Sequence, residues 1–203
     1  MDLLLFSDKK IIILRQEINI HRILDLIYEM PDVSKETLKN NITEVSLPRG
    51  YILLKAERKE KNIYFIKKGV VRAFAPFKGQ DTTFWFGEEG EPVLSMKSYV
   101  ENKVGYENIE LLEDCDLYKI RIEELTKLYH QDIHIANWGR RLAEKELLKI
   151  ESRIVSNELL SAKERYDVLL NTRPSLVQRV PLKHIASYLG MTQVSLSRVR
   201  KIK

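Results

Sequence analysis

Residues 168–203 combine cationic side chains, small hydroxyls and amides without a single carboxylate. No Asp or Glu follows Asp167, whereas seven of the 34 lysines and arginines lie beyond it. The whole chain carries a net charge of +5, so the residues before this segment are net negative. Guanidinium and ammonium groups bind phosphates, and such a segregated basic segment is typical of a nucleic-acid surface. The seven cations are Arg173, Arg179, Lys183, Arg198, Arg200, Lys201 and Lys203.

Apolar spacing predicts two short helices that position these groups. Residues 182–189 carry apolar side chains at helical spacing, and Gly190 then interrupts the pattern as a glycine does after a helix. Thr192 can cap a second helix. If Leu196 and Val199 face the core, about 100° per residue turns a basic and polar face outward. Two helices joined in this way form a helix-turn-helix, whose second helix enters the DNA major groove. The outward face comprises Val194, Ser197, Arg198 and Lys201, flanked by Gln193, Ser195 and Arg200.

A long helix is predicted ahead of this module, over residues 132–157 with Asp132 as its N-cap. One apolar stripe recurs close to a coiled-coil spacing, with Arg140 as the exception. A second stripe of Ile135, Trp138 and Leu142 lies on a neighbouring face. We therefore expect this helix to contact both its own domain and a second copy; the alternative is a single wide stripe packed within one subunit. The predicted dimer seam is Ile133, Ala136, Ala143, Leu147, Ile150 and Ile154.

Short apolar runs separated by turn residues predict a β-sandwich in the first part of the chain. The turn signals are Pro48-Arg49-Gly50, Lys67-Lys68-Gly69 and Lys78-Gly79-Gln80-Asp81. The expected strands are residues 42–47, 51–56, 63–66, 70–77, 82–86, 106–112 and 117–120, with 87–92 as a loop.

Helices are expected around the sandwich and before the basic module. They cover residues 17–30, a short stretch from a Ser34 cap to about residue 40, residues 93–101 and residues 122–129. Residues 1–16 are expected to form a strand or a helix packed on the body. A Ser161–Glu164 capping box starts a helix that runs to residue 170, and residues 176–180 are expected to be extended.

Other chemistries have little support in the sequence. The one cysteine, Cys115, excludes an intrachain disulfide and is expected to be a buried small residue. No phosphate-binding or dinucleotide glycine motif and no catalytic triad pattern occurs, so no catalytic residue, metal or cofactor is predicted. The N-terminus lacks the pattern of a signal peptide or membrane span, so a cytoplasmic protein without membrane contact is expected. The four histidines, His21, His130, His134 and His184, all lie outside the expected sandwich.

The order of sandwich, seam helix, capped helix and helix-turn-helix resembles the Crp/Fnr superfamily of transcription regulators. The segment Ile63-Tyr-Phe-Ile-Lys-Lys-Gly69-Val-Val-Arg72 and the pattern Ala186, Gly190, Leu196, Val199 carry the likeness, and residues 164–198 look like the Bacteroidetes-type branch. The resemblance implies an α+β chain with a cyclic-nucleotide-binding-like jelly roll over residues 1–131, a dimerisation helix over 132–157 and a winged-helix-like DNA-binding domain over 158–203. Since the printed sequence stops at Lys203, the wing is expected to be truncated.

The resemblance also implies partners and site residues. A homodimer would read double-stranded DNA at a near-palindromic operator, with RNA polymerase and an unidentified small-molecule effector as further partners. The family's base-reading positions fall on Gln193, Val194 and Arg198; Arg198 can pair with guanine and Gln193 with adenine. Val194 stands where many relatives hold an acid. The expected phosphate contacts are Lys183, Thr192, Ser195, Ser197, Arg200 and Lys201.

One departure concerns the effector. Cyclic-nucleotide-binding relatives carry an Arg-Ser/Thr pair at the positions held here by Gly105 and Tyr106, and neither neutralises a phosphate as a guanidinium does. We therefore expect an effector other than cyclic AMP, or none. The alternative function is an effector-binding β-sandwich protein, either a cupin-like enzyme or a receptor, whose helix-turn-helix does not bind DNA. The expected effector pocket comprises Phe86, Gly87, Glu88, Glu91, Lys103 and Tyr106.

Overall fold

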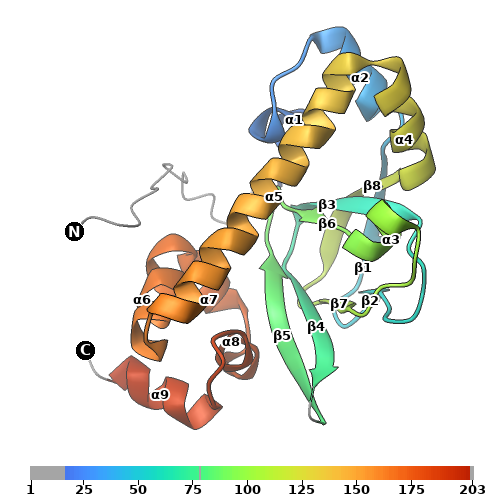
Figure 1. The fold of residues 1–203 in the computed structure, drawn as a ribbon. Helices are drawn as coiled ribbons and strands as arrows, with labels where there is room; N and C mark the ends of the chain where they lie inside the picture. Colours follow the sequence, from blue (N-terminus) through green and yellow to red (C-terminus); the bar gives the residue numbers. More distant parts are fainter. Residues whose placement is uncertain (1–16, 78, 202–203) are drawn as a thin grey trace.

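Two antiparallel four-stranded sheets form the first half of the described chain (Figure 1). The computed structural model describes residues 17–77 and 79–201, so the expectation for residues 1–16 lies outside the described residues. One sheet has the strand order β1-β8-β3-β6 and the other β2-β7-β4-β5. The strands are β1 (Thr43–Leu47), β2 (Ile52–Leu54), β3 (Asn62–Lys68), β4 (Val71–Phe77), β5 (Gln80–Gly87), β6 (Pro92–Val93), β7 (Asn108–Leu111) and β8 (Cys115–Arg121). The predicted sandwich is confirmed.

Strand β3 shows how the sandwich and its helices share one core. Successive side chains of a strand point to opposite faces, and four consecutive residues of β3 are nonetheless buried. Tyr64 and Ile66 pack between the two sheets, whereas Ile63 and Phe65 pack against helices on the outer face. The central strand is thus covered on both sides, which explains its continuous apolar run.

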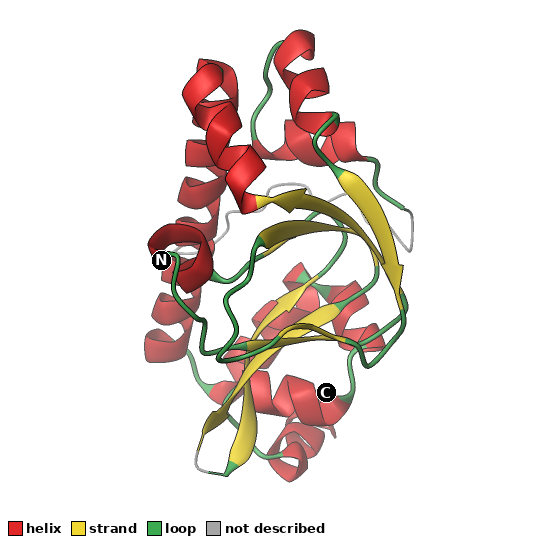
Figure 2. Cartoon of the chain, turned by 90° about the vertical axis from the view of Figure 1, so that its right-hand side faces the viewer, coloured by secondary structure: helices red, strands yellow, loops and turns green. Residues whose placement is uncertain are grey.

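Most helices gather at the two ends of the molecule, whereas α3 lies beside the strands (Figure 1 and Figure 2). The long helix α5 runs from the group of α1, α2 and α4 to the C-terminal group of α6 to α9 (Figure 1). The helices are α1 (Ile20–Ile27), α2 (Asp32–Lys39), α3 (Met96–Glu101), α4 (Ile122–Gln131), α5 (Ile133–Leu159), α6 (Ala162–Thr172), α7 (Pro174–Arg179), α8 (Leu182–Tyr188) and α9 (Gln193–Lys201).

Helix α5 is anchored to its own subunit by its first half. Trp138 is buried among α1 and β3, stacks obliquely on Phe65, and donates its indole N–H to the Leu24 carbonyl at 3.1 Å. Gly139 faces Tyr129, because a Cβ there would lie 2.5 Å from the phenol oxygen. As predicted, Asp132 caps the helix and accepts from the backbone N–H of residues 134 and 135.

A positive-φ glycine closes the turn between β3 and β4. Gly69 has φ +113°, and a Cβ at this position would lie 2.3 Å from the Sγ of Cys115. The close approach therefore requires glycine for both conformation and space. Burial first, and then the charge of Glu113, raise the pKa of the Cys115 thiol to about 12, so this buried cysteine is structural, as predicted.

Three local expectations were wrong. Residues 176–180 are not extended, because Pro174 at the first helical position starts α7. Ser34 does not cap α2, whose N-cap is Pro31; the Ser34 hydroxyl instead hydrogen-bonds the Asp132 side chain. Pro92 and Val93 form β6 against β3, so the helix expected over residues 93–101 begins only at Met96.

Candidate nucleic-acid interface

The turn between α8 and α9 has the geometry that its sequence predicts. Gly190 has φ +69°, and the next amide, of Met191, donates to the Ala186 carbonyl at 3.0 Å. These two features end α8 tightly and reverse the chain. Thr192 then caps α9, because its hydroxyl oxygen accepts from the Ser195 amide at 3.1 Å. The predicted helix-turn-helix is present.

One face of α9 is held in a small apolar core. Leu196 is fully buried and Val199 is partly buried against the same cluster. The cluster includes Ile185 and Ala186 of α8, which places the two helices in direct contact. Leu176, from the unpredicted helix α7, is also fully buried in it.

The opposite face of α9 is open. Val194 is 62% exposed, and Gln193 and Arg198 are also exposed. These three predicted base-reading residues therefore share one free surface. All six predicted phosphate contacts are exposed as well, namely Lys183, Thr192, Ser195, Ser197, Arg200 and Lys201. Two of the hydroxyls, on Thr192 and Ser195, lie 2.9 Å apart at the cap.

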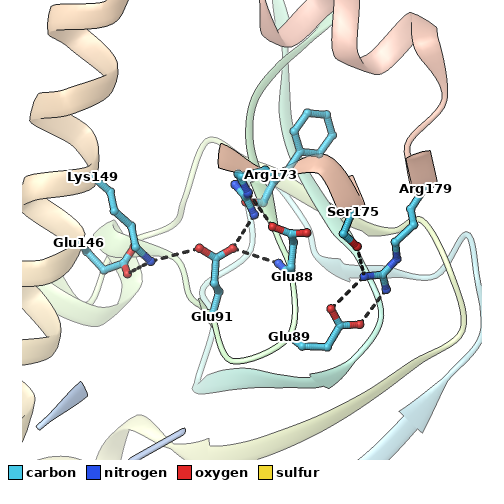
Figure 3. A network of polar contacts seen from close by, with 9 residues as sticks. Glu88, Glu89, Glu91, Glu146, Lys149, Arg173, Ser175 and Arg179 are labelled. Carbon is cyan, nitrogen blue, oxygen red and sulfur yellow. Dashed lines mark hydrogen bonds and ion pairs between the residues drawn. The ribbon is translucent and has the colours of Figure 1, made fainter. Parts of the chain in front are cut away.

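Two of the seven cations belong to a different surface. Arg173 and Arg179 point toward the sandwich, where glutamates engage them (Figure 3). They lie at the two ends of α7, and neither belongs to the exposed face of α9. The free basic surface within the described chain is therefore Lys183 on α8 with Arg198, Arg200 and Lys201 on α9. Lys203 lies outside the described residues.

Helix α8 is docked on β5 of its own sandwich, a contact that the sequence did not predict. The Ser187 hydroxyl accepts from the Thr83 amide at 2.9 Å, and the Tyr188 ring packs on Phe86 at 5.2 Å between centroids. Arg72, buried on β4, has a guanidinium nitrogen 2.6 Å from Nδ1 of His184. No local pattern points to these pairs, because their members lie about a hundred residues apart. The one available signal is a lone arginine inside an apolar strand.

His184 must be the acceptor in its contact with Arg72, because a guanidinium has only donors. The imidazole is therefore neutral in the docked state. Burial first, and then the nearby charges of Arg72 and Lys183, lower the pKa of His184 to about 4, with Asp81 acting in the opposite direction. The terminal nitrogens of Arg72 also bind Glu110 at 2.8 Å and Thr83 at 3.4 Å.

The residues of the expected effector pocket make two sets of contacts: those from Phe86 to Glu91 surround Arg173, whereas Lys103 and Tyr106 have other neighbours. Phe86 is buried against the C-terminal helices, and Gly87 ends β5 beside Trp85. Glu88 and Glu91 bind Arg173. The other two face different neighbours: Lys103 pairs with Glu101, and Tyr106 packs on Phe84. The glutamates are held by the C-terminal module because its arginines pair with them, a contact that the sequence separation concealed.

The two stripes of α5 have separate environments. Ile135, Trp138 and Leu142 are buried in their own subunit. The predicted seam is open along its second half, where Leu147, Ile150 and Ile154 are 64%, 52% and 58% exposed. Ile133 and Ala143 are exposed and Ala136 is partly buried. An apolar row that is not covered by its own subunit is typical of an interaction surface.

The described residues do not form other common classes of site. No cluster of three or more His, Cys, Asp or Glu side chains is placed to hold a metal ion among them. His130 and His134 are separated by the boundary between α4 and α5. Residues 17–77 and 79–201 also contain no helix whose length and apolar character suit a bilayer crossing.

Comparison with family models and with curated proteins finds no match for this chain. Solved structures do match. FixK2 from Bradyrhizobium japonicum is 19% identical, with a TM-score of 0.67 over 79% of this chain and 83% of that chain. The c-di-GMP-responsive global regulator CLP of Xanthomonas campestris is 18% identical, with a TM-score of 0.67 over 84% and 90%.

A third similar structure comes from a protein that is described by its family. It is a candidate transcriptional regulator of the Crp/Fnr family from Eubacterium rectale, 16% identical, with a TM-score of 0.69 over 89% of this chain and 86% of that chain. The match spans the sandwich, the long helix and the C-terminal module together. The chain therefore has the fold of the Crp/Fnr transcriptional regulators, from its jelly roll to its helix-turn-helix.

Proposed function

We propose that this chain is a sequence-specific DNA-binding regulator of the Crp/Fnr type that works as a homodimer. The observation that carries the proposal is the outward face of α9. It is free of acids, holds Gln193, Val194 and Arg198 in the open, and is supported from behind by the buried Leu196. An exposed helix of this composition on a helix-turn-helix fits the major groove.

Each reading residue suits a different base edge. Arg198 can donate two hydrogen bonds to guanine, and Gln193 can pair with adenine in the same bidentate way. Val194 has only methyl groups to offer, which fit a thymine methyl. The operator should therefore differ from those read by relatives that hold an acid at the position of Val194.

The surface around α9 suits phosphate binding. Lys183, Arg200 and Lys201 are exposed near the reading face. If each neutralises one phosphate in both copies, the logarithm of the binding constant should fall against the logarithm of salt concentration with a slope of about −5. Raising salt from 50 to 200 mM should then weaken binding by about a thousandfold.

The homodimer is supported by the open seam of α5. Pairing through Leu147, Ile150 and Ile154 would cover the exposed apolar row, and a two-fold axis would present two recognition helices to successive major grooves, about 34 Å apart. Near-palindromic half-sites follow from that symmetry. A contact with RNA polymerase and action in the cytoplasm stay predictions.

The region of the missing Arg-Ser/Thr pair supports an effector other than a cyclic nucleotide. Gly105 is buried, and a Cβ at this position would lie 2.6 Å from the Ser95 hydroxyl and 2.9 Å from the Glu107 carboxylate. No room is left there for a larger side chain, and a buried carboxylate repels a phosphate.

Selection of bound duplexes from a random DNA pool tests the proposal. Purified protein should enrich a near-palindrome, and a gel shift with that duplex should show the steep salt dependence. Failure to bind any duplex at low salt would favour the receptor or cupin-like alternative. No feature of the described residues favours that alternative now, because the four histidines lie on α1, α4, α5 and α8 and not on strands.

A further inference from the structure

The short loop between β5 and β6 contacts the sandwich, the long helix α5 and the C-terminal module. A dimer bound to DNA requires fixed positions of these three parts relative to one another. The loop carries Glu88, Glu89 and Glu91 (Figure 3). Its glutamates bind Arg173 and Arg179 of the C-terminal module, and Glu91 also lies 3.3 Å from the Lys149 ammonium of α5. Backbone hydrogen bonds to Ile66 of β3 attach the loop to the sandwich.

Arg173 is held at several points. Its Nε lies 2.7 Å from Glu88, its Nη2 lies 2.8 Å from Glu91, and its Nη1 donates to the Phe86 carbonyl at 3.2 Å. Both glutamate side chains are only 13% exposed. Because the guanidinium is planar and rigid, these partners fix its orientation as well as its position.

Arg179 holds the other end of α7. Its two terminal nitrogens lie 2.7 and 2.9 Å from the two oxygens of Glu89, and Nη2 also lies 2.6 Å from Glu113. Burial acts to raise the pKa of Glu89, but the bonds from Arg179 and the Gly69 amide outweigh it and leave that pKa lowered. Glu89 is therefore charged in its bound state at neutral pH.

The loop itself has little freedom. The Gly90 amide donates to the Ile66 carbonyl at 2.7 Å, and the Ile66 amide donates to the Glu91 carbonyl at 3.0 Å. Within the loop, the Glu88 amide donates to the Glu91 carboxylate at 3.0 Å. The carboxylates thus stand on a backbone that is fixed to β3.

This docking leaves the reading face free. Lys183, Gln193 and Arg198 stay exposed while α7 and α8 are bound to the sandwich. Contacts that covered the reading face would inhibit DNA binding, but these contacts lie behind it. The arrangement therefore suits a device that pre-orients the module.

We propose that the Glu88–Glu91 loop is a coupling element that fixes the DNA-binding module relative to α5 and so sets the distance between the two recognition helices of the dimer. The inference rests on the proposed function. Apolar contacts between the module and the sandwich are non-directional, and the hydrogen bonds of α8 with the sandwich hold only one helix. The glutamates of this loop bind two arginines of the module and one lysine of α5, and so define the orientation of the module relative to α5. Without the carboxylates the two modules would bind DNA as if tethered flexibly.

The test measures affinity for paired half-sites as a function of their separation. Duplexes that carry the selected half-site once, or twice with spacers varied by single base pairs, are bound to the full chain and to Glu91→Gln. Glu123→Gln is the matched control, since Glu123 lies on α4, pairs only with exposed Arg121 and Lys127 in the described structure, and changes the net charge equally.

The ratio of best-spaced to single-site affinity reports rigidity. It should be about 100-fold or more for the wild type, as for a well-matched bivalent ligand, and should fall at least tenfold in Glu91→Gln with a broader spacing profile. Single-site affinity should stay within twofold of the Glu123→Gln value. An unchanged ratio and profile in Glu91→Gln would overturn the coupling.

A second measurement separates this inference from the proposed function. The Thr83 amide donates to Ser187 across the docked interface, so its hydrogen exchange reports docking without DNA. Exchange should accelerate at least tenfold in Glu91→Gln and Arg173→Ala, less in Arg173→Lys, and not in Glu123→Gln. If the protein ignores DNA but shows this order, the regulator proposal fails and the coupling stands. If Thr83 exchange is equal in all variants, the contacts of α8 with β4 and β5 hold the module without the loop, and the coupling is wrong.

Discussion

Replacing Ile150 by alanine is expected to weaken self-association through α5 without destabilising the protomer. Ile150 is 52% exposed and lies on the same side of the helix as Leu147 and Ile154. None of the three belongs to the buried clusters of the protomer. The truncation therefore removes contact area that only a partner can provide.

The magnitude follows from the exposed area. Burying a whole isoleucine side chain contributes about 1.5–3 kcal/mol. Because about half of Ile150 is still exposed in the protomer, its burial in a dimer contributes about 0.8–1.6 kcal/mol per copy, and the two-fold axis doubles this. Alanine removes most of the contact, so the dissociation constant of the dimer should rise about 10- to 50-fold.

Sedimentation equilibrium over a range of protein concentrations measures this constant directly. Leu148→Ala is the matched control, because Leu148 is similarly exposed at 60% but lies about 100° around the helix from Leu147. It should leave the constant unchanged, and urea unfolding at concentrations where both variants are dissociated should be equal. Equal dissociation constants for Ile150→Ala and Leu148→Ala would refute the assignment of the seam.

Four further predictions concern separate parts of the chain. Arg198→Ala should cost about 1–3 kcal/mol of operator binding and relax preference at one base pair, as measured on all single-base variants of the selected duplex; a uniform loss would mark a phosphate contact. Leu196→Ala should destabilise the C-terminal module by about 2–5 kcal/mol, whereas Val194→Ala should change urea stability by less than about 0.5 kcal/mol. Docking of α8 should weaken on acidification, because the pKa of His184 is about 4 when docked, below its ordinary value of about 6.5. This contribution is complete above about pH 6.5 and is lost as pH falls toward 4. The protection factor of the Thr83 amide, which corrects for the slower intrinsic exchange at lower pH, should fall over that range in the wild type but not in His184→Gln. Gly139→Ala should destabilise the protein, because overpacking against Tyr129 at 2.5 Å costs about 1–3 kcal/mol and outweighs a helix-propensity gain of about 1 kcal/mol; a higher melting temperature would show that the Tyr129 ring yields easily.

Local patterns were enough to predict most of the elements and the reading face. Apolar periodicity identified α5, α8 and α9, and the capping residues Asp132, Ser161 and Thr192 marked helix starts that the structure confirms. These signals work because they depend on neighbours within one turn of helix. Helix α7, which was not predicted, also has a local signal, because Pro174 suits a first helical turn.

Long-range ion pairs were beyond such reasoning. The sequence shows that Arg173 and Arg179 belong to a basic segment, but not that each pairs with glutamates that lie 66 to 90 residues earlier in the chain. Net charge describes the segment as a whole, whereas function depends on which cations remain unpaired after folding. The same applies to Arg72 and His184, whose contact exists only because α8 docks on the sandwich.

Within its nine residues, helix α9 has a buried side that holds it in place and an exposed side that carries the proposed reading residues. The side that secures it rests on Leu196 and Val199, and its solvent side contributes almost nothing to folding. Substitutions at Gln193, Val194 and Arg198 are therefore tolerated by the scaffold whatever these side chains contact. If α9 reads DNA as proposed, a few substitutions on its exposed side would change the preferred bases without disturbing the buried side that holds the helix in place.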